Sequence, residues 1–151
     1  MKRLLIVHHS ASGGATRMRD AVLEGVRRGD AVALSVLRAA DAGPADVLAT
    51  DALILGTPEN FGYMSGALKD FLERIYHPCL ERTQGLPWAL FVRAGNDGRG
   101  AVDSVNRIVT GLRWREVATP VIARGELEET ALLACRELGE TLATGLATGI
   151  F

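Results

Sequence analysis

Several residue types and patterns that mark other classes of protein are scarce in this chain. Only 2 of its 151 residues are cysteines, Cys79 and Cys135, and they lack CxxC spacing. We therefore expect two reduced, partly buried thiols in a cytoplasmic protein rather than a disulfide. The apolar run near the N-terminus, Leu4 to Val7, is too short for a signal peptide or a membrane span. We expect no contact with a membrane.

An excess of charge of one sign is also lacking. The chain has 17 Lys and Arg against 18 Asp and Glu, a formal net charge of -1, and its cations do not cluster. Nucleic-acid binding usually requires a basic patch, so we expect no nucleic-acid partner. With 48% hydrophobic and 23% charged residues, the composition is typical of a globular protein. At this length we expect a single domain over residues 1–151, with a core that needs no structural metal.

Short apolar segments alternate with amphipathic helical patterns along the chain. We expect strands at 4–7, 31–37, 52–55, 88–92 and 117–123, and helices at 16–28, from 44, at 65–77, at 102–112 and from 126 onward. This order predicts an α/β three-layer sandwich around a five-stranded parallel sheet of order 2-1-3-4-5. Pro120 marks the last strand as an edge strand. Ligands are expected at the loops after strands one, three and four.

A segment rich in small and hydroxyl residues, HSASGGAT at 9–16, follows the first strand and leads into the first helix. Backbone N–H groups at such a helix start attract phosphate, and the segment lacks both GxxxxGK[ST] and GxGxxG. It therefore favours a phosphate monoester over a pyrophosphate. The alternative is an ordinary helix cap that binds nothing. The expected phosphate-binding residues are Ser10, Ser12, Gly13, Gly14, Ala15 and Thr16.

The most specific stretch lies at 51–72. It contains GTP at 56–58, FGYMSG at 61–66 and KDF at 69–71. These motifs resemble those of flavodoxin-like flavoproteins, in particular the NAD(P)H-dependent FMN or quinone reductases related to the tryptophan-repressor-binding-protein family. The resemblance implies a flavodoxin-like fold over essentially the whole chain.

The same resemblance implies that three loops bind FMN. The first loop would hold the phosphate, and the other two would contact the isoalloxazine ring. Backbone donors near its pyrimidine edge would raise the reduction potential of the flavin. Because the flavin carries the chemistry, no catalytic side chain is expected. The implied residues in the second loop are Pro58, Glu59, Asn60, Phe61 and Gly62, and those in the third are Ala94, Gly95, Asn96, Asp97 and Gly98.

Two functions of different classes follow. In the first, the chain is an enzyme that transfers electrons from NAD(P)H through FMN to a quinone or another small acceptor, with ping-pong kinetics. In the second, it is a flavodoxin-like electron-transfer module without nicotinamide turnover, or a scaffold that has lost flavin. The third loop has no aromatic residue, which favours an open flavin face and the enzyme. Arg38, Arg93 and Arg99 are equal candidates for contact with a 2′-phosphate. A homodimer is expected on general grounds.

Other side chains leave alternatives open. His8 and His9 are adjacent on a strand and point to opposite sides, so no metal site is expected. Glu59 is either a hydrogen-bond acceptor beside the flavin or a solvated loop charge. Trp114 either packs in the core or lies at a subunit contact. A receiver-type signalling domain is excluded, because the positions after the first and third strands are not acidic.

Overall fold

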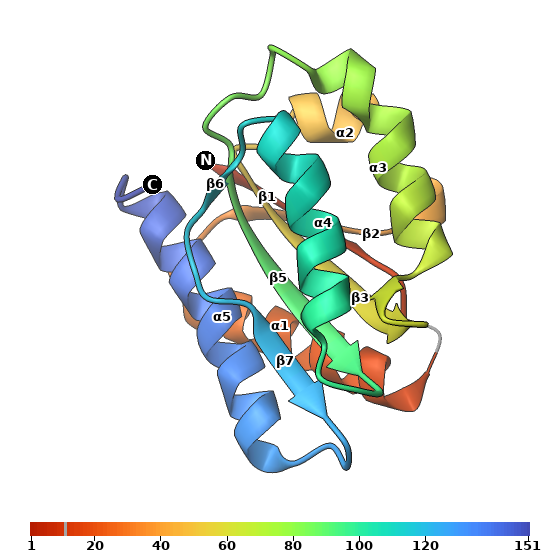
Figure 1. Ribbon diagram of the computed structural model, residues 1–151. Coiled ribbons are helices and arrows are strands. Elements are labelled where there is room, and N and C mark those ends of the chain that lie inside the picture. The colour runs from red at the N-terminus through yellow and green to blue at the C-terminus, as the bar shows by residue number, and fades with distance from the viewer. Residues whose placement is uncertain (11) are drawn as a thin grey trace.

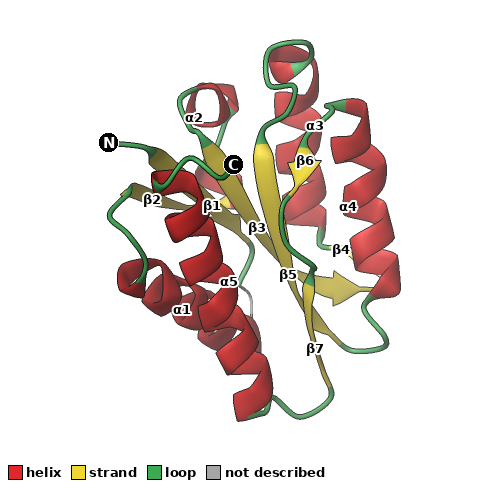
Figure 2. Ribbon diagram, turned by 90° about the vertical axis from the view of Figure 1, so that its left-hand side faces the viewer, coloured by secondary structure: helices red, strands yellow, loops and turns green. Residues whose placement is uncertain are grey.

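The protein is a three-layer α/β sandwich. The computed structural model describes residues 1–10 and 12–151 (Figure 1). A central sheet is covered by α1 and α5 on one face and by α3 and α4 on the other (Figure 2). The strands are β1 (Arg3–His8), β2 (Ala33–Arg38), β3 (Ala52–Asn60), β4 (Tyr63–Met64), β5 (Pro87–Ala94), β6 (Arg115–Glu116) and β7 (Val121–Arg124). The helices are α1 (Gly13–Arg28), η1 (Ala39–Asp41), α2 (Pro44–Leu48), α3 (Gly66–Cys79), α4 (Arg99–Gly111) and α5 (Glu129–Ala147).

The strand order confirms the predicted flavodoxin-like class. The sheet runs β2-β1-β3-β5-β6, with β7 also paired to β5. All these pairs are parallel. The predicted fourth strand is β5, and the predicted fifth corresponds to β7, which pairs with the outer edge of β5 as β6 also does. The order of the main strands is therefore the predicted 2-1-3-4-5.

The predicted number of five strands is wrong, because the sheet has seven. Of the last predicted strand, 117–123, only the part from Val121 onward is a strand, β7; β6 lies before the predicted bounds, and the segment that holds Pro120 separates the two. Proline has no N–H to donate and restricts the residue before it, so the pairing with β5 stops and resumes. The remaining strand, β4, folds back antiparallel to the end of β3.

Side chains of each central strand alternate between the two faces of the sheet. Leu5, Leu53 and Leu90 pack toward α3 and α4, whereas Ile6 and Ile54 pack toward α1 and α5. The continuous apolar runs thus follow from helices that cover both faces. Cys79 and Cys135 are buried and unbonded in these two opposite clusters.

Three expected boundaries shift at the edge where the strands end. α1 begins at Gly13 rather than residue 16, because Ser12 Oγ accepts from the amide of Ala15 (3.3 Å). α4 begins at Arg99 rather than near residue 102, after Gly98 with φ of 77°. β3 continues to Asn60, because β4 supplies it with an antiparallel partner. The strands and helices therefore extend into the segments that we expected to be loops.

Trp114 is part of the core. Its side chain is buried, and its indole Nε1 donates to Thr83 Oγ1 (2.9 Å). This contact supports the packing interpretation over a subunit contact. Among residues 1–10 and 12–151, no helix is both long and apolar enough to cross a bilayer.

Candidate functional site

The carboxyl ends of β1, β3 and β5 meet at one edge of the sheet, at the lower end of the molecule in Figure 1. A cavity of about 310 Å³ lies there. It takes residues from all three segments that the sequence singled out, although they are far apart along the chain. The residues that line it are Ser12, Pro58, Asn60, Arg93, Ala94 and Gly95.

The first segment is largely the opening turn of α1. Ser12 caps the helix, and the amide of Thr16 donates to the Ser12 carbonyl (3.0 Å). Gly13, Gly14 and Ala15 form the first turn, whose N–H groups have no acceptor within the helix apart from the cap. That turn contains no acidic residue. The segment therefore presents the positive end of a helix beside the cavity, as a phosphate site requires. Ala11 lies outside the described residues.

A buried histidine supports this first segment. His8 is 4% exposed at the end of β1, and its Nδ1 lies 2.9 Å from Ser10 Oγ. Burial, followed by the positive charge of Arg19, lowers the pKa of His8 to about 4. The imidazole is therefore neutral at neutral pH and can orient the Ser10 hydroxyl without adding charge. His9 Nδ1 is buried without a hydrogen-bond partner among the described residues.

The second segment ends in a tight hairpin. Phe61 and Gly62 lie between β3 and β4 with φ of 53° and 68°, and Asn60 pairs with Tyr63. Positive φ at both central residues is the geometry of a type I′ turn, which suits the right-handed twist of the strands. The Phe61 side chain is fully exposed. Of the five predicted residues in this segment, Pro58 and Asn60 line the cavity, whereas Glu59, Phe61 and Gly62 do not.

Glu59 joins the second segment to the third. Its Oε1 accepts from the backbone amide of Asn96 (3.0 Å). Its Oε2 is buried and has no hydrogen-bond partner among the described residues. A buried carboxylate oxygen without a donor is costly, so this atom is available to accept a hydrogen bond from water or from a ligand. Glu59 is therefore a bound acceptor between two loops rather than a solvated charge.

The third segment is ordered by its own hydrogen bonds. Ala94 and Gly95 line the cavity. Asp97 Oδ1 accepts from the amide of Arg99 (3.0 Å), and the Asp97 carbonyl accepts from Arg124 Nε (3.0 Å). Gly98 has positive φ and lies close to Ile122. Asn96, Asp97 and Gly98 thus shape the loop, but they do not line the cavity.

Sequence reasoning missed Arg93 as a residue of this cavity and considered it only for a 2′-phosphate. Arg93 lies near the end of β5, two residues after Phe91, whose side chain faces α1 and α5. The alternation of a strand therefore directs Arg93 toward the start of α1. That alternation was readable from the sequence once the strand was extended past residue 92.

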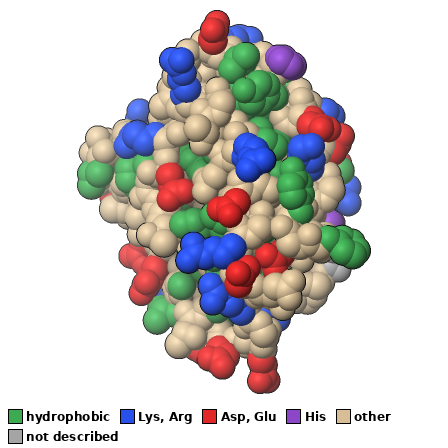
Figure 3. All heavy atoms as spheres, in the orientation of Figure 1, with side chains coloured by type: hydrophobic (Ala, Val, Ile, Leu, Met, Phe, Trp, Pro, Cys, Tyr) green, Lys and Arg blue, Asp and Glu red, His purple; other side chains and the backbone are tan. Residues whose placement is uncertain are grey.

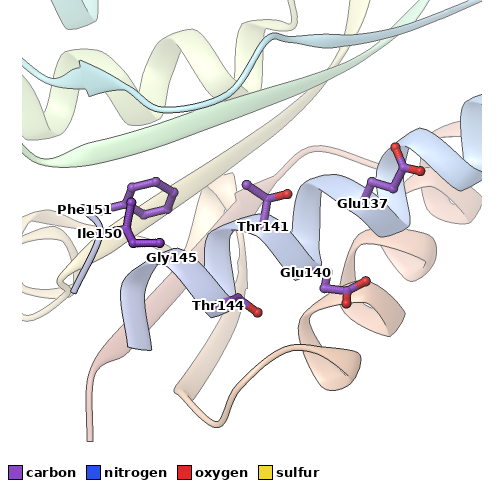
Figure 4. Close-up of a pocket in the computed structure, with 7 residues that line it drawn as sticks. All are labelled: Glu137, Glu140, Thr141, Thr144, Gly145, Ile150 and Phe151. Atoms are coloured by element: carbon purple, nitrogen blue, oxygen red, sulfur yellow. The ribbon is translucent and has the colours of Figure 1, made fainter. Parts of the chain in front are cut away.

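A second hollow, of about 400 Å³, lies against the C-terminal half of α5 at the other end of the molecule (Figures 1 and 4). It contains none of the predicted site residues. Among residues 1–10 and 12–151, no group of three or more His, Cys, Asp or Glu side chains is arranged to hold a metal ion. The residues that line this second hollow are Glu137, Glu140, Thr141, Thr144, Gly145, Ile150 and Phe151.

Comparison with known proteins adds independent evidence. The family described as NADPH-dependent FMN reductase matches residues 35–128. An NAD(P)H dehydrogenase (quinone) of Acidithiobacillus ferrooxidans is 31% identical over 94 residues, which cover 49% of this chain and 47% of that protein. A flavodoxin of Aquifex aeolicus is 24% identical over an alignment 163 positions long, which covers 97% of this chain and 88% of the flavodoxin. The chain thus spans about half the length of the curated quinone dehydrogenases it matches.

A solved structure agrees with this fold. The WrbA-like flavodoxin of Agrobacterium tumefaciens superposes with a TM-score of 0.76 at 22% identity, covering 95% of this chain and 96% of that one. The family match includes the second and third segments of the site and ends before α5. The family match over more than half of the sequence confirms the predicted family, and the fold agrees with it. The chain therefore belongs to the NADPH-dependent FMN reductase family of flavodoxin-like flavoproteins.

Proposed function

We propose that this protein binds FMN in the cavity at the ends of β1, β3 and β5, and that it passes electrons from NAD(P)H to a quinone or another small acceptor. The observation that carries the proposal is the convergence of Ser12, Pro58 and Gly95, one from each expected segment, on one cavity. The proposed contacts are the expected residues that line this cavity, with Arg93 added: Ser12, Pro58, Asn60, Ala94, Gly95 and Arg93.

The chemistry of the cavity fits FMN in two respects. The first turn of α1 offers backbone donors and the positive end of a helix dipole to a phosphate. Glu59 does not line the cavity but lies between Pro58 and Asn60, which do; its Oε2 is an acceptor that has no donor among the described residues, and the isoalloxazine ring carries an imide N–H. An anion site and an unpaired acceptor thus complement the two polar ends of the cofactor.

When bound, FMN supplies reversible redox chemistry, so the chain needs no general acid or base of its own. Its residues bind and orient. Ser12 fixes the start of α1, and Pro58 holds the end of β3 rigid beside the ring. The bond from the Asn96 amide to Glu59 keeps the second and third segments at a fixed separation. Such fixed backbone dipoles tune the potential of a bound flavin without moving during the reaction.

Access to the cavity favours a small acceptor. The third segment, 94–98, has no aromatic side chain that would stack on the flavin. Phe61, at the tip of the hairpin, extends into solvent. A nicotinamide or a quinone ring could therefore approach the flavin from the open side. The family is described as NADPH-dependent FMN reductase, and two relatives are NAD(P)H dehydrogenases (quinone), which supports these two ring systems as reaction partners.

One observation favours a second candidate, an electron-transfer module. The flavodoxin relative aligns over 97% of this chain, whereas the quinone dehydrogenase of Acidithiobacillus ferrooxidans aligns over 49%. A protein partner for such a module commonly docks through complementary charge. Basic and acidic side chains are interspersed on the face of the molecule shown in Figure 3, so this face presents no patch of one charge for such a partner.

The two candidates differ in their reaction with reduced nicotinamides. We would load the full chain with FMN, remove oxygen, add NADPH or NADH and follow the visible absorbance of the flavin. For the enzyme, we expect reduction of the flavin, reoxidation by an added quinone, and many turnovers with parallel double-reciprocal plots. Free FMN at the same concentration is the control.

Two other outcomes would contradict the proposal in different ways. If FMN binds and dithionite reduces it, but neither nicotinamide does, the chain is an electron-transfer module. If FMN does not bind at all, the assignment of the cavity to a flavin is wrong.

A further inference from the structure

Arg93 occupies an unusual position in the cavity. Its Nη1 donates to the carbonyl of Ala123 (3.0 Å), and its Nη2 donates to the carbonyl of Gly125. A Cβ atom on Gly14 would lie 2.7 Å from Arg93 Nε. The guanidinium is therefore held between the end of β7 and the first turn of α1, and Arg93 lines the cavity. The absence of a side chain at Gly14 makes this approach possible.

The charge of this guanidinium is not neutralised by the chain. Among residues 1–10 and 12–151, Arg93 takes part in no ion pair, and the two carbonyl groups that hold it are neutral. It is half-buried next to the positive end of α1, whose first turn has no acidic residue. Two positive groups in contact repel one another, so this arrangement favours an anion in the adjacent cavity.

A bound phosphate monoester would relieve that repulsion. The carbonyl groups of Ala123 and Gly125 fix two of the guanidinium's donor groups, so little side-chain freedom is lost when an anion binds. A flavin without phosphate would gain nothing from the same charge. Because both Nη atoms donate to carbonyl groups, Arg93 would attract the phosphate through its charge rather than through a bidentate contact.

We propose that Arg93 makes this site selective for the phosphorylated flavin, FMN, over riboflavin. The proposal rests on the proposed function, because it assigns the cavity to a flavin. Arg93 acts through its fixed positive charge beside the start of α1, and the backbone of residues 123–125 holds that charge in place. The 2′-phosphate of NADPH is the competing occupant.

The test compares the dissociation constants of FMN and riboflavin, measured by quenching of flavin fluorescence with the full chain. Arg93→Met and Arg93→Gln remove the charge, and Arg93→Lys retains it. We expect the two neutral variants to weaken FMN about tenfold or more, equivalent to about 1.4 kcal/mol, and to change riboflavin by less than about twofold. Arg93→Lys should keep most of the selectivity.

Arg115→Met is the matched control, because Arg115 is an exposed arginine on β6, at the amino end of β5. It should leave both dissociation constants unchanged. In the wild type, added salt should weaken FMN much more than riboflavin, a measurement that needs no variant to fold.

Three results would overturn the proposal while leaving the flavin site intact. The neutral variants could weaken both flavins equally, which would make Arg93 a structural clamp. The preference of the wild type for FMN could be insensitive to salt and to Arg93→Gln. The neutral variants could instead change only the ratio of KM for NADPH and NADH. If the wild type binds neither flavin, the proposed function itself has failed.

Discussion

His8 is a buried side chain whose pKa lies well below its ordinary value. It lies at the end of β1 beside the expected phosphate segment, with Ser10 Oγ 2.9 Å from its Nδ1. Burial contributes most to the low pKa of His8; the guanidinium groups of Arg19 and Arg38 and the neighbouring His9 lower it further, and Asp20 has a smaller opposing effect. Of these effects, only that of Asp20 favours the charged imidazole. The neutral form is part of the folded site.

The low pKa predicts how stability depends on pH. The folded protein holds His8 neutral down to about pH 4, whereas the unfolded chain binds the proton near the usual pKa of 6.5. Stability should therefore fall as pH decreases from about 6.5 to about 4, by up to about 3 kcal/mol from this residue. Urea unfolding of the wild type and of His8→Gln across that range measures the effect.

The difference between the pH dependences of the wild type and His8→Gln separates the contribution of His8 from that of the carboxylates, which both proteins share. In His8→Gln the pH dependence should be shallower, while His77→Gln, at an exposed helix position, should follow the wild type. Parallel curves for the wild type and His8→Gln would mean that the imidazole charges as easily in the fold as outside it.

At the residue scale, the sequence predicted which segments meet but not which side chains face the cavity. Ser12, Pro58 and Gly95 line it as residues of the expected segments. Glu59 and Phe61 could not be placed, because their orientation depends on a hairpin that pairs the end of β3 with β4. Arg93 was missed because its role depends on a contact with Gly14, which is far away in the sequence.

At the element scale, α1 and α5 cross at very short distance. A Cβ on Gly139 of α5 would lie 2.1 Å from the carbonyl oxygen of Val22 in α1. A Cβ on Gly25 would lie 1.9 Å from the carbonyl oxygen of Arg136. Both atoms met are backbone, which cannot turn aside as a side chain can. The two glycines therefore set the spacing of the layer behind the site.

This spacing predicts a reversal of the usual effect of alanine. In a helix interior, Gly→Ala ordinarily stabilises by roughly 1 kcal/mol. Gly139→Ala should instead destabilise the protein by about 1–3 kcal/mol, because α1 and α5 must move apart. Gly66→Ala, at the first residue of α3 with open space around it, is the control and should be neutral or slightly stabilising. The free energy of unfolding in urea distinguishes them.

If Gly139→Ala proves as harmless as Gly66→Ala, the helices are not in the close contact described. If Gly139→Ala is harmless and Gly25→Ala destabilises the protein, the close contact between the helices is limited to Gly25.

Most elements were predictable because their apolar patterns are strong, and their ends were not. The runs in β1, β3 and β5 identified buried parallel strands, and the stripes in α1, α3 and α4 identified covering helices. The ends depend on caps and pairing. Ser12 starts α1 earlier than the apolar stripe does, and the last expected strand is confined to β7, after Pro120.

At the scale of the whole molecule, the fold brings together segments that are tens of residues apart. The parallel order β2-β1-β3-β5 places the carboxyl ends of β1, β3 and β5 side by side, so one edge of the sheet collects the polar segments. The hollow against α5 lies at the opposite end and is lined partly by Ile150 and Phe151 (Figure 4). It is larger than the cavity at the strand ends, but it contains none of the polar segments that the topology collects there.

A map of the FMN site by ¹H–¹⁵N NMR of the full chain tests the position of the flavin most directly. If FMN binds where β1, β3 and β5 end, one equivalent should shift the amide signals of residues 12–16, 58–62 and 93–98. The signals of residues 137–151, around the hollow on α5, should be unaffected. Shifts confined to residues 137–151, or no shifts with FMN at all, would contradict the assignment of the flavin to the edge where β1, β3 and β5 end.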